Sequence, residues 1–132
     1  VTAGIYSAND VVGGTLTFGT GAAILRAVTI TDLAKQTGAY QLVFFKSAPT
    51  DIADNGTYDI ADADHAKIVG GVHITDTVGA DRFDLADSKF YHRQGLMLPL
   101  ESGTLYAFLI ALGTPTYAAT NDVGITLHLE KT

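Results

Sequence analysis

Four histidines are the side chains of this chain best suited to proton transfer or to binding a transition metal: His65, His73, His92 and His128. No two of them lie within five residues of each other, so no short-range pair of metal ligands exists. His73 and His128 fall on the outward positions of predicted strands, where a surface role is expected. None of the serines lies in a Gly-x-Ser-x-Gly elbow. The sequence therefore predicts no catalytic residue, no metal site, no cofactor and no enzyme activity.

Part of an acidic segment, residues 51–64, matches a calcium-binding loop. Asp51, Asn55, Gly56 and Asp62 occupy positions 1, 5, 6 and 12 of the twelve-residue template. Position 3, which should supply a ligand, is Ala53, and position 12 is Asp in place of the bidentate Glu. Because Asn-Gly is also an ordinary turn dipeptide, the pattern favours a long solvated acidic loop over a calcium site.

Composition excludes several classes of function. The chain has 132 residues and a net charge of −6, and its eight Lys and Arg residues are scattered. Binding to nucleic acid requires a basic stripe that displaces counterions, so we expect no nucleic-acid partner. There is no cysteine, which removes disulfides and thiolate sites. We also expect no membrane partner, because the longest charge-free apolar run, Thr104–Leu112, is too short to cross a bilayer.

That run also organises the predicted fold. Gly103 precedes it and Gly113 follows it, which indicates a strand buried on both faces. We expect its larger side chains to face the core between two sheets and its smaller ones to face the other way. The larger set comprises Tyr106, Phe108, Ile110 and Leu112, and the smaller set comprises Leu105, Ala107, Leu109 and Ala111.

Seven further segments have the alternation or the apolar content of short strands: 11–18, 24–33, 39–47, 68–75, 89–92, 96–100 and 122–131. Gly13 and Gly14 predict a bulge in the first of them, and Pro99 predicts an edge position. One helical turn is expected at 62–67, capped by Asp62. The pattern predicts an all-β fold, a jelly-roll-like β-sandwich of about eight antiparallel strands with long loops.

Domain organisation is simple, and surface residues carry the functional hypothesis. We expect an N-terminal arm, residues 1–9, followed by a single sandwich domain, residues 10–132. Several tyrosines lie in the arm, in loops or in short segments, where exposure is expected, and Tyr is enriched at protein interfaces. The predicted partner-binding residues are Ile5, Tyr6, Tyr58, Tyr91 and Tyr117.

Read as a whole, the chain resembles the capsid decoration or cement proteins of tailed bacteriophages. The resemblance covers nearly the whole chain and consists of short stretches without chemical motifs. These stretches are Tyr6–Gly14, Ile30–Gln36, Leu42–Phe45 with Pro49, Ala61–Asp64, Lys67–Gly70 and Leu112–Tyr117. It implies a jelly-roll sandwich that binds the outer face of an icosahedral shell and stabilises it.

The resemblance also implies partners and a location. The partners would be the major capsid protein and a second copy of the chain, as a homodimer across two-fold positions. The location would be the outer capsid surface of the virion, after synthesis in the host cytoplasm. The sequence shows no secretory signal pattern at its start, which agrees with that route.

Two other classes remain open from the residues alone. A carbohydrate-binding or receptor-binding module of a virion would have the same fold and would use exposed aromatic rings. A cupin-like or hydrolytic enzyme would need histidines and carboxylates gathered inside the barrel.

Overall fold

The structure, a computed structural model, describes residues 4–101, 103–119 and 121–132. Eleven strands and one short 3₁₀ helix make up its regular elements, and every pairing between strands is antiparallel. In chain order they are β1 (Gly4–Ile5), β2 (Val11–Gly19), β3 (Ala23–Asp32), β4 (Tyr40–Phe45), η1 (Asp62–Lys67), β5 (Ile68–Ile74), β6 (Arg82–Asp84), β7 (Lys89–Arg93), β8 (Leu98–Leu100), β9 (Thr104–Ala111), β10 (Thr116–Tyr117) and β11 (Val123–Lys131).

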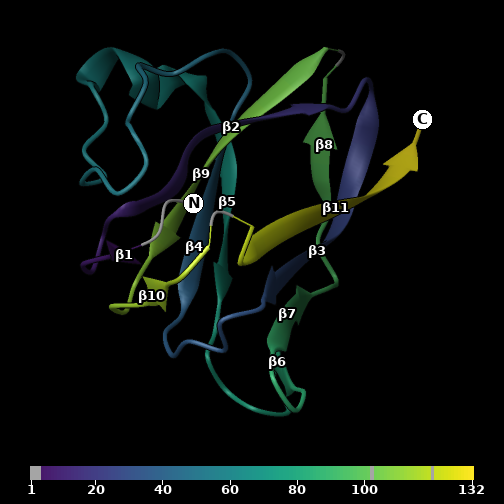
Figure 1. Ribbon diagram of the computed structural model, residues 1–132. Coiled ribbons are helices and arrows are strands. Elements are labelled where there is room, and N and C mark those ends of the chain that lie inside the picture. The colour runs from purple at the N-terminus through teal and green to yellow at the C-terminus, as the bar shows by residue number, and fades with distance from the viewer. Residues whose placement is uncertain (1–3, 102, 120) are drawn as a thin grey trace.

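Two main sheets form the sandwich. One has the order β2-β9-β4-β5, and the other has the order β11-β3-β7-β6, with β8 paired to β3 beside β7. The chain passes from one sheet to the other repeatedly, as Figure 1 shows for the long strands. This arrangement confirms the predicted all-β sandwich of antiparallel strands. Three short strands, β1, β6 and β10, were not predicted, because two or three residues carry no detectable alternation.

Strand β9 lies between β2 and β4, which confirms its predicted central position. The prediction of which face meets the other sheet is wrong. The smaller set, which includes Leu105 and Leu109, belongs to the main core between the sheets. The larger side chains, which include Phe108 and Ile110, belong to a second apolar cluster on the opposite face. The main core needs small residues here because it is already filled by tyrosines and by the leucines and isoleucines of the facing strands.

The second cluster explains why β9 is apolar on both faces. Val11, Phe45, Phe108 and Ile110 form its buried part. Residues of the acidic segment, among them Ile52, Tyr58 and Ile60, pack against it. In Figure 1 this segment and η1 lie at the upper left, beside the sheet that contains β9. The segment is therefore a long loop whose apolar side chains cover the outer face of that sheet, a role that was not predicted, while Asp51, Asp59 and Asp62 stay exposed.

Two local predictions hold and one does not. The pairing of β2 with β9 shifts register between Val12 and Leu16, where Gly13 and Gly14 have φ values of 88° and 70°, so the predicted bulge is confirmed. The predicted helical turn is η1, Asp62–Lys67. Its N-cap is Ala61, with no side-chain cap, so the expected capping role of Asp62 is wrong.

The first residues that the structure describes are packed onto the sandwich. Gly4 and Ile5 pair with β10, the Tyr6 amide donates to the Pro115 carbonyl at 2.9 Å, and the Tyr6 side chain is fully buried. The prediction of a separate arm therefore does not hold for residues 4–9, because Tyr6 is part of the core and the Asn9 amide donates to the Ala111 carbonyl at 2.7 Å. The arm's first three positions, 1–3, lie outside the described residues. Among the described residues, no helix has the length and apolar character that a membrane span requires.

Candidate functional site

The two sheets differ in how their outer faces are covered. The acidic segment covers the outer face of β2-β9-β4-β5, whereas most side chains on the outer face of β11-β3-β7-β6 are exposed or half-exposed. We call this second surface the open face. It comprises Arg26, Thr29, Thr31, Phe83, Phe90, His92, Thr126, His128 and Glu130. Alternation along the paired strands places most of these residues on one side, while neighbours such as Tyr91 point into the core. Arg26 lies at the register shift between β3 and β11, and its bond to Glu130 places its side chain on the same face.

Aromatic side chains lie at the β6 edge of the open face. Phe83 and Phe90 are cross-strand partners, and their rings stack with centroids 4.7 Å apart and an interplanar angle of 12°. Phe83 stays 45% exposed, and the flanking Val78 and Leu85 are more than half exposed. Exposed apolar residues that gather in one place are a feature of protein-binding surfaces. This edge is therefore the most apolar part of the open face.

Two histidines meet in the middle of the open face. His92 on β7 and His128 on β11 have ring centroids 5.5 Å apart. Both contact Thr29 on the strand between them: His92 Nδ1 lies 2.8 Å and His128 Nε2 lies 2.9 Å from Thr29 Oγ1. The predicted exposure of His128 is confirmed. The contact between His92 and His128 was not predicted, because the two residues are 36 positions apart in sequence. The registers of β3 with β7 and β11 would have been needed to find it.

The charges of the open face cancel. Arg26 Nε donates to Glu130 Oε2 at 2.6 Å across the β3–β11 pair. No other Lys, Arg, Asp or Glu belongs to the face as defined above. In a chain with a net charge of −6, this face is therefore close to neutral. A neutral surface loses less solvation energy than a charged one when a partner covers it.

The tyrosines predicted to bind a partner are mostly inside the molecule. Tyr6, Tyr91 and Tyr117 are at most 1% exposed, and Tyr58 is half-buried against Phe108 with ring centroids 6.0 Å apart. The prediction that these tyrosines form an exposed surface is therefore wrong. Ile5 is 69% exposed. The tyrosines are buried because their rings fill the core while each hydroxyl reaches a polar partner at its rim.

The hydroxyls of Tyr91 and Tyr117, together with that of Tyr40, belong to a polar cluster at one end of the sandwich. The Tyr91 hydroxyl lies 3.2 Å from the Gly38 carbonyl oxygen and 3.3 Å from Asp76 Oδ1. The hydroxyls of Tyr40 and Tyr117 hydrogen-bond to each other. Burial raises the pKa of Tyr40, Tyr91 and Tyr117, and neighbouring negative charges add to the effect at Tyr91. These phenols stay protonated and cannot act as bases or nucleophiles near neutral pH.

Asp76 holds the cluster together electrostatically. Its Oδ1 lies 2.7 Å from Arg82 and 3.3 Å from Lys89 Nζ, and its Oδ2 accepts the Gly38 amide at 2.7 Å. Burial by itself raises the pKa of Asp76, but the hydrogen bonds from Arg82 and Gly38 and the charge of Lys89 outweigh it and keep the pKa low. A carboxylate whose oxygens are all engaged in this way is a structural anchor and is not available to a substrate.

Asp32, also at this end, is fully buried. Burial raises the pKa of its carboxyl, and the amides of Gln36 and Ala34, both at 2.9 Å, offset part of that rise. These bonds form a turn after β3, so Asp32 shapes the connection to β4. A raised carboxyl pKa can indicate an acid catalyst, but both Asp32 oxygens are occupied by the turn. Asp32 therefore acts as part of the fold.

The calcium template does not form a metal site. Asp51 hydrogen-bonds Thr15 Oγ1, Asn55 donates to the Ile5 carbonyl at 3.3 Å, and Asp62 begins η1. Within residues 4–101, 103–119 and 121–132, no group of three or more His, Asp or Glu side chains could hold a metal ion. Asp51 and Asp54 attach this segment to the sandwich, through Thr15 and through Tyr6 and the Gly13 amide, respectively.

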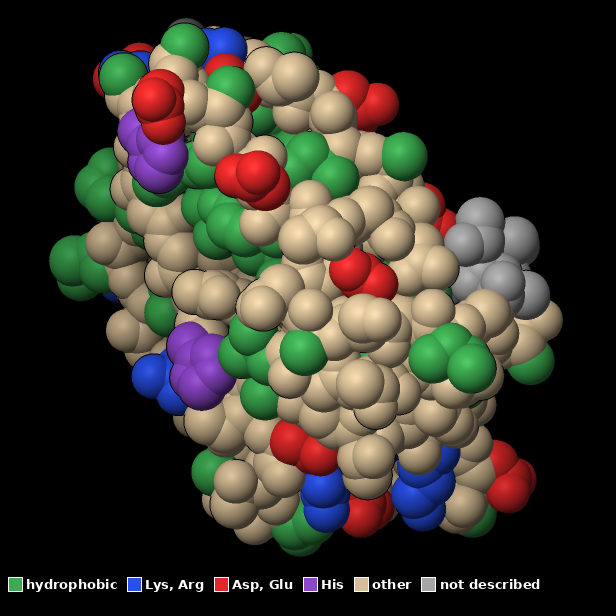
Figure 2. All heavy atoms as spheres, turned by 90° about the vertical axis from the view of Figure 1, so that its left-hand side faces the viewer, with side chains coloured by type: hydrophobic (Ala, Val, Ile, Leu, Met, Phe, Trp, Pro, Cys, Tyr) green, Lys and Arg blue, Asp and Glu red, His purple; other side chains and the backbone are tan. Residues whose placement is uncertain are grey.

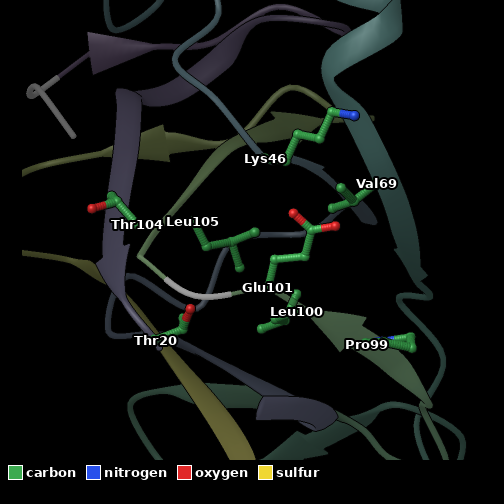
Figure 3. A pocket seen from close by; sticks show the side chains of 8 residues that line it. All are labelled: Thr20, Lys46, Val69, Pro99, Leu100, Glu101, Thr104 and Leu105. Atoms are coloured by element: carbon green, nitrogen blue, oxygen red, sulfur yellow. The ribbon is translucent and has the colours of Figure 1, made fainter. Parts of the chain in front are cut away.

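A small pocket opens beside the start of β9. It holds about 100 Å³ and is lined by residues such as Thr20, Lys46, Glu101 and Leu105 (Figure 3). Among the described residues that line it there is no histidine and no pair of carboxylates.

The side of the molecule turned toward the viewer in Figure 2 shows scattered acidic side chains and few basic ones, without a basic stripe. Comparison with known proteins adds no relative: no family model matches the chain, and no curated protein or solved structure matches it.

Proposed function

We propose that this protein is a structural protein of a tailed-bacteriophage virion. In this proposal it binds the outer surface of the icosahedral capsid and cements neighbouring subunits of the major capsid protein. The observation that carries the proposal is the open face, which is close to neutral and partly aromatic. The chain covers the outer face of the other sheet with its own acidic segment but leaves the open face available to a partner. The resemblance of the sequence to decoration proteins supports the choice of the capsid as the partner.

The physical account is adhesion repeated many times. Packaged DNA pushes subunits apart, and a protein that bridges a seam resists that separation. Contacts that are weak for one copy become strong when they are repeated around a symmetric shell. The negative net charge of the chain favours the outside of the shell, since packaged DNA repels it.

A second copy of the chain is part of the proposal, as a homodimer across capsid two-fold positions. Ile5 is a candidate contact residue, because it is 69% exposed although its neighbour Tyr6 is in the core. Deleting residues 1–9 would remove Tyr6 and perturb the fold, so Ile5→Asp is the cleaner variant. We expect it to reduce capsid occupancy without lowering the unfolding temperature of the free protein.

A thermal assay on capsids tests the proposal. Capsids assembled without the protein are incubated with it, and rupture is followed by the release of packaged DNA during heating. Decorated capsids should rupture at a higher temperature than bare ones. Equal rupture temperatures at full occupancy would remove the cementing role, and failure to bind at all would remove the capsid as partner.

The alternative of a carbohydrate-binding or receptor-binding module loses its main support. It relied on tyrosines that form an exposed stacking platform, and three of the four predicted tyrosines are buried. The remaining exposed rings on the open face are Phe83 and the half-buried Phe90, which stack on each other. A glycan array would distinguish the two functions: specific binding to one glycan class would favour the alternative.

A further inference from the structure

We propose that His92 and His128 form a binding site for a divalent transition-metal ion on the open face. Three observations carry the proposal. The two imidazoles come from different strands, their nitrogens converge on one atom, and the site faces a hollow that can admit solvent ligands. Zn²⁺, Ni²⁺ and Cu²⁺ are the ions that imidazole nitrogen prefers, whereas Mg²⁺ and Ca²⁺ prefer oxygen.

The spacing of the rings fits chelation. Two imidazoles bound to one tetrahedral ion at ordinary zinc–nitrogen distances have ring centroids roughly 5 Å apart. The centroids of His92 and His128 are 5.5 Å apart, with planes inclined at 81°. Strand pairing sets this separation, because β3 lies between β7 and β11 and holds both of them in register. The pair is therefore close to the required geometry without any movement of the backbone.

Thr29 identifies the nitrogens that would bind. His92 Nδ1 and His128 Nε2 lie 2.8 and 2.9 Å from Thr29 Oγ1, so both point to the same small region. A threonine hydroxyl has one proton, so it donates a hydrogen bond to one ring at most. The other ring can hydrogen-bond to this hydroxyl only by donating its own N–H. An ion bound by the two nitrogens would replace these shared hydrogen bonds.

Water would complete the coordination. His128 is exposed, and the hollow beside the pair has a volume of about 410 Å³, with Arg26, Gln94 and Met97 among its lining residues. The guanidinium of Arg26 would repel a cation, but it is neutralised by Glu130. No third His, Asp or Glu joins the pair among the described residues. The site is therefore a two-histidine site of moderate affinity that is open to exchange.

Calorimetric titration of the intact protein with ZnCl₂ or NiCl₂ tests the proposal, and titration with MgCl₂ is the negative control. We expect one site per chain for Zn²⁺ and none for Mg²⁺. His92→Ala and His128→Ala should each weaken Zn²⁺ binding by more than about tenfold, because a single imidazole no longer chelates. His73→Ala, which removes an exposed histidine from β5 in the other sheet, should leave the affinity unchanged.

Electron paramagnetic resonance of bound Cu²⁺ gives an independent readout on the unmodified protein. Two nitrogen ligands per copper are expected, and Thr29→Val should retain them, since that change removes the hydroxyl but neither imidazole. A purely structural Thr–His network predicts no stoichiometric metal binding at all. The proposal is overturned if wild type and the His92→Ala/His128→Ala double variant bind Zn²⁺ equally, or if His73→Ala weakens binding as much as either substitution at the pair.

Discussion

Tyr40 and Tyr91 meet edge to face across the space between the two sheets, with ring centroids 5.3 Å apart and planes inclined at 81°. Tyr40 comes from β4 and Tyr91 from β7, so the contact joins one sheet to the other. The Tyr40 hydroxyl also forms a hydrogen bond with the hydroxyl of Tyr117 on β10. Three buried phenols thus connect both sheets and the small β1-β10 pair.

Removing the hydroxyls of Tyr40 and Tyr117 together should cost less unfolding free energy than the sum of removing each alone. Tyr40→Phe leaves the buried Tyr117 hydroxyl without this partner, and a buried polar group in that position costs about 1–3 kcal/mol. Tyr40→Phe/Tyr117→Phe removes both partners, so its loss of unfolding free energy should be smaller than the sum of the two single losses. Urea unfolding of the four proteins measures the difference. Additive losses would mean that the two hydroxyls do not depend on each other.

Asp64 should make the protein sensitive to acid. Its hydrogen bond with Lys67, assisted by the Thr50 amide, lowers the pKa of the carboxyl to about 2. In the unfolded chain an Asp carboxyl has a pKa of about 3.9. The stabilising contribution of Asp64 is therefore fully present above about pH 4 and is lost as the pH falls toward 2.

Comparison of wild type with Asp64→Asn checks this dependence. The difference in their unfolding free energies should be largest near neutral pH and should narrow between about pH 4 and pH 2. Asp62→Asn is the matched control, because Asp62 is an exposed carboxyl of the same short helix. A difference for Asp64→Asn that stays constant across this pH range would contradict the assignment.

Tyr58 should hold the acidic segment on the sandwich. Its ring packs against Phe108, and its amide donates to the Asn9 carbonyl at 2.8 Å. Tyr58→Ala should lower the free energy of local opening by about 1–2 kcal/mol, which is roughly tenfold faster amide exchange in the segment. Hydrogen exchange followed by mass spectrometry measures it. Tyr58→Phe keeps the ring, so amide exchange in its acidic segment should match that of wild type. If amide exchange in Tyr58→Ala also matches wild type, other residues hold the segment.

The sequence was sufficient for the long strands, because alternation and flanking turn residues act locally. Residues 11–18, 24–33 and 122–131 were predicted within one residue of β2, β3 and β11. The position of β9 at the centre of its sheet also followed from its apolar character. The short strands β1, β6 and β10 did not, since such a short segment is stabilised by its partner strand more than by its own composition.

The candidate site was less predictable for a physical reason. Tyr91 and Tyr117 looked exposed because short polar segments surround them, yet tertiary packing buries both rings. Phe108 was assigned to the wrong face because the covering role of residues 51–60 depends on long-range contacts. The His92–Thr29–His128 arrangement likewise requires the register of three strands, which no local pattern encodes.

Binding through the open face is the central claim, and a charge placed on that face tests it most directly. Thr31 is exposed on β3, and its cross-strand neighbour Gly124 has no side chain, so Thr31→Lys fits without disturbing the core. Gln41→Lys makes the same change in charge at an exposed position of β4 in the other sheet. Occupancy of undecorated capsids by each variant is the measurement. We predict that Thr31→Lys lowers occupancy at least about tenfold, because it buries an unpaired charge, while Gln41→Lys binds like wild type. Equal occupancy for the two variants would contradict the claim.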